Sequence, residues 1–206
     1  DWYAPILPQE TTMLLAYLNG GGRLLLSSQD FLYYHDQDPL ARRFGVEHWD
    51  ESYHPTHAFG VPDQPTGGPW GPVKLDFPFK NLADAIEPLP EATPVMRGQV
   101  GQPIGIAREI TASRTLFYAF PLETLPLATR AALLADGVGW LSPLGKSRWT
   151  VTPTTPLPGE RVTHTLFIYN DAATALTTTL THTLPASTTL TADGPPPAWE
   201  YVAAAR

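Results

Sequence analysis

The sequence predicts an α/β domain followed by an all-β, immunoglobulin-like sandwich, and two observations lead to this order. A helical pattern, a run of glycines and a short apolar run follow one another at residues 8–27, as in α/β folds. Composition then changes: residues 1–145 hold 9 of the 13 basic and 16 of the 20 acidic residues, whereas residues 146–206 are nearly neutral and hold 15 threonines. Threonine-rich segments are typical of strands with one solvated face. We therefore expect an α/β domain at 1–145 and a β-sandwich at 146–206.

The first elements follow from local patterns. Residues 8–22, PQETTMLLAYLNGGG, predict a helix with an acid in its first turn and glycines at its end. Residues 23–27, RLLLS, predict a parallel strand covered on both faces. A second short helix is expected at 38–46, where Asp38 can cap the helix and Pro39 suits its first position.

Residues 50–95 are rich in proline, glycine and aromatic residues and show no sustained period. We interpret them as an inserted excursion of short strands and loops, held together by Trp70, Phe77 and Phe79. The α/β domain is expected to continue with two strands, residues 103–110 and 114–122, joined by a polar turn.

The α/β domain is expected to end in a helix at residues 125–141. Apolar residues recur there at spacings of four and three, the pattern of an amphipathic helix. These residues are Leu127, Ala131, Leu134, Val138 and Leu141.

The second domain is expected to contain strands throughout, separated by turn residues at spacings typical of a β-sandwich. The predicted strands are residues 148–154, 160–170, 175–185 and 188–192. An immunoglobulin-like sandwich normally uses about seven strands. Four strands therefore predict either a sandwich that is cut short or one that completes its core against the first domain or another chain.

Composition excludes several classes of function. The formal charge is −7 and no basic run exceeds Arg42–Arg43, which argues against nucleic-acid binding. No apolar run approaches the length of a membrane span, and no signal peptide is visible. Cysteine is absent, which excludes disulfides, thiolate metal sites and a cysteine nucleophile. The sequence begins without methionine, so we expect a piece of a longer protein.

Two stretches of the first domain resemble the later part of a class I glutamine amidotransferase-like domain. They are LLAYLNGGGRLLLSSQD, residues 14–30, and SRTLFYAFPLETLPLATRAALLADGVGWL, residues 113–141. The resemblance implies a flavodoxin-like α/β fold that lacks its early strands here. In the second domain, residues 155–190 resemble DUF11, an Ig-like repeat domain of bacterial surface proteins. That resemblance implies an exported, multidomain bacterial protein located outside the cell or at its surface.

The amidotransferase family needs a cysteine at the turn after the strand and a downstream histidine paired with an acid. This chain has serines at that turn, and no histidine lies between His57 and His164. A serine without a nearby base is a weak nucleophile, so we expect no catalytic residues. Because ligands of open α/β sheets bind at the carboxyl ends of strands, the same turn remains the candidate ligand pocket. It would comprise Ser27, Ser28, Gln29, Asp30 and His35.

The segment from residue 30 to residue 57 is dense in aspartate, glutamate and histidine. The spacings in HDQD and HPTH would allow Asp36, Asp38, His54 and His57 to bind a metal ion. No established metal-binding motif is met, and acidic loops are commonly only solvated. No cofactor is expected.

The aromatic residues of the excursion offer another function, because exposed coplanar rings stack on sugars. A private hydrophobic cluster is the simpler interpretation of aromatics in a proline- and glycine-rich loop. The residues concerned are Trp49, Tyr53, Phe59, Trp70, Phe77 and Phe79.

The sequence thus favours a non-catalytic accessory or binding module beside other domains of a longer parent protein. The alternatives are a hydrolase that uses Ser28 or a metal bound in the 30–57 segment, and a carbohydrate-binding module. A sheet that begins in mid-fold leaves an edge uncovered, which promotes association, so a homodimer is one expected form.

Overall fold

The structure is a computed structural model that describes residues 6–66, 68, 71–172 and 174–178. The chain divides into two compact units, Asp1–Ala173 and Thr174–Arg206. In the second unit the described residues, 174–178, form no helix or strand. All helices and strands of the described residues therefore belong to the first unit.

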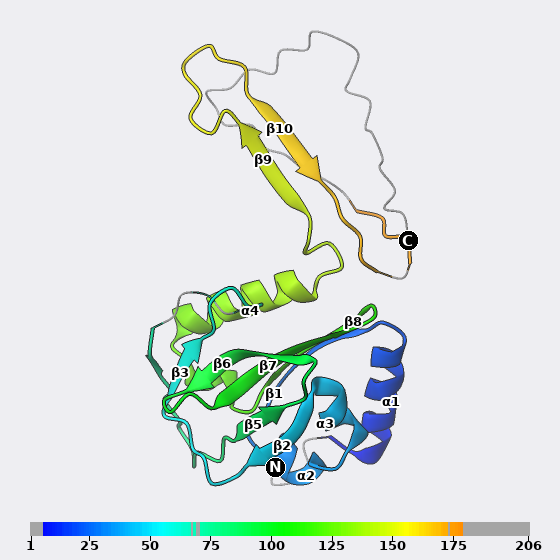
Figure 1. The fold of residues 1–206 in the computed structure, drawn as a ribbon, viewed down its shortest axis with the longest axis vertical. Helices are drawn as coiled ribbons and strands as arrows, with labels where there is room; N and C mark the ends of the chain where they lie inside the picture. The colour runs from blue at the N-terminus through cyan, green and yellow to red at the C-terminus, as the bar shows by residue number, and fades with distance from the viewer. Residues whose placement is uncertain (1–5, 67, 69–70, 173, 179–206) are drawn as a thin grey trace. The chain divides into compact units, whose positions relative to one another are not determined.

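A mixed sheet of six strands forms the centre of the first unit (Figure 1). Its strand order is β1-β8-β7-β6-β3-β4, and only the β1–β8 pair is parallel. The strands are β1 (Arg23–Ser27), β3 (His57–Gly60), β4 (Val73–Lys74), β6 (Ala92–Gly98), β7 (Pro103–Ile110) and β8 (Ser113–Tyr118).

This topology shows that the predicted flavodoxin-like α/β fold is wrong. Such a fold joins successive parallel strands through crossover helices. Here β6, β7 and β8 are consecutive antiparallel neighbours. Only two residues separate β7 from β8, and Thr111 adopts a left-handed φ of 57° between them. A connection of this length reverses the chain, so β8 runs antiparallel to β7.

The predicted separate Ig-like sandwich is also wrong. Among the described residues after 145, the strands are β9 (Arg148–Thr152) and β10 (Thr163–Phe167), which form one antiparallel hairpin. Most residues of both strands are exposed, so within the first unit the hairpin has no second sheet against which to build a core. The strand predicted at 175–185 is absent over 175–178, and its remainder, like the strand at 188–192, lies outside the described residues. The boundary near residue 145 stays a prediction.

Three helices cover one face of the six-stranded sheet: α1 (Pro8–Asn19), α2 (Phe31–His35) and α3 (Pro39–Phe44). The predicted cap of α3 is confirmed, because the Asp38 carboxylate accepts a hydrogen bond of 2.8 Å from the Leu40 N–H. A two-stranded antiparallel ribbon, β2 (Val46–Asp50) with β5 (Ala85–Pro88), joins the same core.

The other face carries the short 3₁₀ helix η1 (Leu122–Thr124) and α4 (Leu127–Leu141). Side chains alternate between the two faces as strands require: Phe117 of β8 lies in the core under α1–α3, whereas Leu116 and Tyr118 lie in the core under α4. Strand β1 is parallel as expected, but it is an edge strand of this sheet and its residues are only half-buried. None of the described helices is long and apolar enough to cross a membrane.

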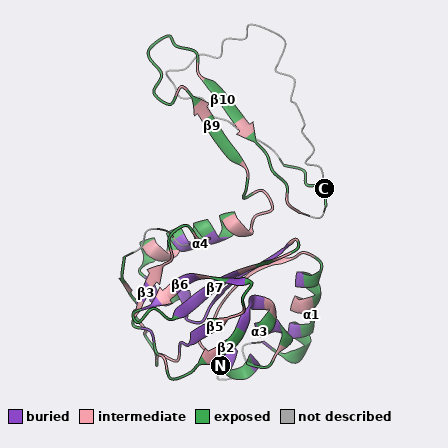
Figure 2. Cartoon of the chain, viewed as in Figure 1, coloured by how far each residue is buried: buried purple, intermediate pink, exposed green. Residues whose placement is uncertain are grey.

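Helix α4 forms where its periodicity predicts it, but most of the apolar stripe that predicts it faces away from the sheet (Figure 2). Leu127 is 72% exposed and Val138 is 63% exposed. The helix instead meets the sheet through Leu133 and Gly137, which are buried. A Cβ atom at Gly137 would lie 3.2 Å from a Leu116 methyl carbon, so the glycine permits this close approach.

The excursion at residues 50–95 contains the expected short strands and loops: β3, β4, β5 and the start of β6. Phe77 was expected to hold the excursion together with Trp70 and Phe79, but it packs against the core under α4. Phe79 is 44% exposed, and Trp70 lies outside the described residues.

Candidate functional site

The two serines of the candidate pocket lie at the carboxyl end of β1, beside the carboxyl end of β8. The Ser27 hydroxyl donates a hydrogen bond of 2.8 Å to the Phe120 carbonyl and accepts one of 2.9 Å from the Leu122 N–H. It thereby fastens β1 to the segment that leads from β8 into η1. Both hydrogen bonds join the hydroxyl to backbone groups, so Ser27 has a structural role.

Ser28 and Gln29 also bind backbone. The Ser28 N–H extends the β1–β8 ladder by donating to the Tyr118 carbonyl at 3.1 Å. Its hydroxyl accepts a hydrogen bond of 3.2 Å from the Asp30 N–H, which closes a local turn before α2. The side-chain oxygen of Gln29 accepts a hydrogen bond of 3.2 Å from the Leu82 N–H. The turn therefore holds together β1, β8 and the loop before β5.

His35, the histidine nearest to these serines in sequence, is buried and serves another contact. Its ring stacks on Phe31 with a centroid distance of 4.8 Å and an interplanar angle of 20°. Its Nδ1 lies 3.0 Å from an Asp38 carboxylate oxygen, and the same carboxylate caps α3. His35 thus links α2 to α3. The structure gives it no contact with Ser27 or Ser28 that would make either serine a nucleophile.

A buried acid, Asp84, lies close to this turn and was missed by the sequence analysis. Its N–H donates a hydrogen bond of 3.1 Å to the Ala119 carbonyl, at the carboxyl end of β8. The residue is 2% exposed, and its Oδ2 has no hydrogen-bond partner among the described residues. Burial, together with the nearby charges of Asp30, Glu51 and Asp50, raises the pKa of Asp84 to about 8. At neutral pH Asp84 is therefore mainly a neutral carboxylic acid.

The candidate metal ligands do not converge. Asp36 accepts from the Gln37 N–H at 2.8 Å, while Asp38 binds His35 and the start of α3. His57 Nδ1 lies 3.1 Å from the Thr56 hydroxyl oxygen, and His54 Nδ1 lies 3.4 Å from the Ala83 carbonyl oxygen. Within the described ranges, no group of three or more histidine, aspartate or glutamate side chains has the arrangement of a metal site.

The described aromatic residues of the excursion do not make the platform that sugar stacking requires. Trp49 packs against the core under α1–α3, and Tyr53 packs against the core under α4. The rings of Phe77 and Phe79 lie 6.1 Å apart at 80° to each other, whereas a platform needs coplanar rings. The half-buried Phe59 lies in β3.

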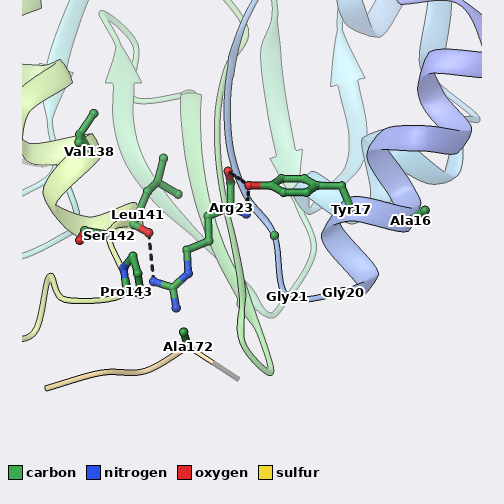
Figure 3. A pocket seen from close by; sticks show the side chains of 11 residues that line it. Ala16, Tyr17, Gly20, Gly21, Arg23, Val138, Leu141, Ser142, Pro143 and Ala172 are labelled. Carbon is green, nitrogen blue, oxygen red and sulfur yellow. Dashed lines mark hydrogen bonds between the residues drawn. The ribbon is translucent and has the colours of Figure 1, made fainter. Parts of the chain in front are cut away.

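A groove opens at the opposite, amino end of β1 (Figure 3). Its volume is about 810 Å³, in the range of ligand-binding clefts. It lies between the end of α1 and the end of α4, and its lining includes Tyr17, the glycine turn 20–22, Val138, Leu141 and Ala172. The glycine turn is a sequence signal for it, because a Cβ atom at Gly22 would lie 2.5 Å from the Tyr17 ring.

Arg23 forms the polar part of this groove. The Tyr17 hydroxyl accepts from the Arg23 N–H at 3.0 Å and donates to the Arg23 carbonyl at 3.1 Å. The Arg23 guanidinium donates to the Leu141 carbonyl at 3.0 Å and forms an ion pair of 2.6 Å with the Asp171 carboxylate. Arg23 thus joins α1, α4 and the segment after β10.

The roles of the two serines predict different costs for their removal. Ser27→Ala is expected to lower the free energy of unfolding by about 1–3 kcal/mol, because a carbonyl and an N–H lose their partner together. Ser28→Ala should cost under about 1 kcal/mol, since it removes one longer hydrogen bond from a local turn. Urea unfolding of both variants measures the two free energies. A larger loss for Ser28→Ala than for Ser27→Ala would contradict the role of Ser27 in joining β1 to the segment between β8 and η1.

Comparison with known proteins assigns no family. The sequence matches no protein-family model and no curated protein sequence. Solved structures with similar backbones include a cold-adapted β-galactosidase from Rahnella sp. R3 (16% identity, TM-score 0.48) and an exo-β-1,4-mannosidase from Opitutaceae bacterium strain TAV5 (18%, 0.42). A cytoplasmic protein from Salmonella typhimurium is similar at 14% identity and a TM-score of 0.46.

These matches cover 66%, 65% and 66% of this chain, respectively. The chain spans 21% and 22% of the length of the two glycosidases and 61% of the Salmonella protein. Because the identities are low and the backbones align loosely, the likenesses carry no conclusion about the activity of this chain.

Proposed function

We propose that the chain is a non-catalytic accessory or binding module of a longer, exported bacterial protein. The observation that carries this proposal is the engagement of the Ser27–Ser28 turn. Both hydroxyls bind backbone groups, and His35 pairs with Asp38 instead of with a serine. An activated serine needs a base within hydrogen-bond reach. The contacts of this turn therefore support a structural role for both serines.

Export and cell-surface location are the part of the proposal that comes from sequence. The resemblance of residues 155–190 to DUF11, a repeat domain of bacterial surface proteins, is what supports this location. Of the β9–β10 hairpin, β10 (Thr163–Phe167) lies within this stretch and β9 (Arg148–Thr152) precedes it. Fractionating cells that express the full parent protein, with detection by an antibody raised against this chain, tests the location directly.

The hydrolase alternative predicts hydrolysis that depends on Ser28 or on a bound metal ion, and an esterase assay separates it from the accessory role. We expect no hydrolysis of p-nitrophenyl acetate above the buffer background, and the same result for Ser28→Ala, because among the described residues the Ser28 hydroxyl binds the Asp30 N–H and His35 binds Asp38. Dialysis against EDTA should leave the melting temperature unchanged. Saturable hydrolysis that disappears in a folded Ser28→Ala variant, or that disappears after EDTA treatment, would replace the accessory role by an enzymatic one.

A further inference from the structure

Next to the groove, and sharing Arg23 with it, two arginines from neighbouring strands hold a carboxylate. Arg23 of β1 and Arg114 of β8 are direct partners in the parallel ladder, so their side chains start side by side. Both form ion pairs with Asp171: Arg23 through one carboxylate oxygen and Arg114 through the other. One carboxylate is therefore held between two guanidinium groups, which is a strong and directional arrangement.

The two arginines are positioned by contacts other than Asp171. Arg23 donates to the Leu141 carbonyl at 3.0 Å, and Arg114 donates to the Trp140 carbonyl at 2.7 Å, both at the end of α4. Arg114 is 1% exposed, and its guanidinium lies 5.3 Å from the centre of the Trp140 ring. Carbonyls at the end of α4 hold both guanidinium groups, and the Trp140 ring also contacts that of Arg114. We therefore expect both groups to stay in place when another carboxylate replaces that of Asp171.

The charges around this site favour an acidic ligand. Among the described residues, three cations, Arg23, Arg114 and Lys146, form ion pairs with two acids, Asp171 and Glu109. The group thus keeps a positive charge, although the whole chain carries −7. Burial acts to raise the pKa of Asp171, but the hydrogen bonds from Arg23 and the charges of Arg114, Arg23 and Lys146 lower it below the usual value. The carboxylate on this site is therefore ionised at neutral pH.

The residues next to the carboxylate define the rest of the ligand. Ala172 follows Asp171 and lines the groove, together with apolar atoms of Tyr17, Val138 and Leu141 (Figure 3). The chain thus places an aspartate on the arginine pair and, directly after it, a small apolar residue in the wall of the groove. The same positions would suit a segment of another protein with this pattern.

We propose that this groove and the arginine pair beside it are a docking site for a partner peptide in which an aspartate or glutamate adjoins small apolar residues, and that Asp171 occupies the arginine pair in cis. The proposal rests on the assignment of the chain as a binding module and names the chemistry of the partner. An internal ligand competes at an effective concentration on the order of mM. The intact chain should therefore bind such a peptide weakly, and should bind it better when Asp171 is neutralised.

Fluorescence anisotropy with a labelled peptide tests this competition. The probe is Ile-Tyr-Asn-Asp-Ala, the sequence of residues 168–172. We expect Asp171→Asn to bind it at least about tenfold more tightly than the unaltered chain. A probe with asparagine in place of its aspartate should bind neither protein. Equal binding of both probes, or equal affinity of both proteins for the acidic probe, would overturn the proposal.

Two valine variants locate the binding and do not depend on the folding of Asp171→Asn. Val138, which lines the groove, is 63% exposed, and Val100, between β6 and β7, is 69% exposed. In the unaltered background, Val138→Asp should abolish saturable binding at mM concentrations of probe, and Val100→Asp should leave it unchanged. Binding that survives Val138→Asp, or no binding to any protein, would refute docking in this groove. Neither of these binding results bears on hydrolysis. The non-catalytic proposal is therefore tested separately, by the p-nitrophenyl acetate assay.

Discussion

Arg114→Met is expected to lower the free energy of unfolding by about 3–5 kcal/mol. The Arg114 side chain is buried, donates to the Trp140 carbonyl at 2.7 Å and pairs with Glu109 and Asp171. Methionine fills a similar volume but leaves the carbonyl without this donor and removes one of the cations that Asp171 contacts. Removing one partner of a buried ion pair is costly because the remaining charge is poorly solvated. Urea unfolding at pH 7 measures the loss.

Arg97→Met is the matched control. Arg97 lies in β6, is half-buried and donates to the Gly101 carbonyl of the following turn. Its replacement should cost under about 1 kcal/mol. A double variant, Arg114→Met with Asp171→Asn, should lose less stability than the sum of the two single variants, because it leaves no uncompensated carboxylate. A cost of Arg114→Met equal to that of Arg97→Met would show that the arginine pair does not hold β1, β8 and α4 together.

Local signals in the sequence predicted local structure well. The Asp38-Pro39 pair marks the start of α3, and the glycine turn marks the end of α1. The strand at 103–110 matches β7 in both limits. In each case residues close in sequence decide where the helix or strand begins and ends, through capping, chain reversal or alternation. These local interactions are present in any fold that contains the segment.

Strand order and direction were not predictable in the same way. The apolar run of β1 is compatible with any covered strand, and the sequence does not show that β8 would be its parallel neighbour, because partners such as Arg23 and Arg114 are far apart in the chain. A flavodoxin-like fold implies a parallel sheet, whereas β6, β7 and β8 form antiparallel hairpins. The outward face of α4 has the same origin, since apolar spacing predicts a helix but does not decide which side meets the sheet.

The candidate sites show a similar division. The Ser27–Ser28 turn was found from sequence because it lies at a strand end, but the partners of its hydroxyls come from residues 120 and 122 and from the following turn. Arg114 and Asp84 were not recognised, because charged residues usually lie at the surface and the sequence does not show that these two are buried. A single acid between apolar neighbours, as in Ala83-Asp84-Ala85, is the one local signal that Asp84 offers.

Asp84→Asn is expected to change how stability depends on pH. The pKa of this carboxyl is about 8 in the folded chain, against an ordinary value of 3.8. Below about pH 4 the carboxyl is protonated in both the folded and the unfolded state, so it adds no pH dependence there. Between about pH 4 and 8 the folded chain keeps a proton that the unfolded chain releases. Stability should therefore fall as pH rises through this window and level off above it, with a slope of at most about 1.4 kcal/mol per pH unit from this group.

Asparagine cannot ionise, so Asp84→Asn should remove this slope. The variant should match the unaltered chain near pH 4 and exceed its stability by a few kcal/mol near pH 8. Urea unfolding at half-unit steps from pH 4 to 9 gives the difference curve, in which the titration of the other carboxyls cancels. Asp36→Asn is the control, because Asp36 is exposed and should leave the curve flat. A stability difference that stays constant across the window would mean that Asp84 is ionised in the folded chain.

Asp30 provides the second half of this test, because its charge is the largest Coulomb contribution to the raised pKa of Asp84 after burial itself. Asp30→Asn should lower the pKa of Asp84 and move the upper end of the pH window down, without removing the slope. The effect should weaken at high salt, since screening acts on a charge at the half-buried Asp30 more than on burial. If Asp30→Asn removes the slope completely, repulsion between the two acids, and not desolvation, keeps Asp84 protonated beside the carboxyl ends of β1 and β8.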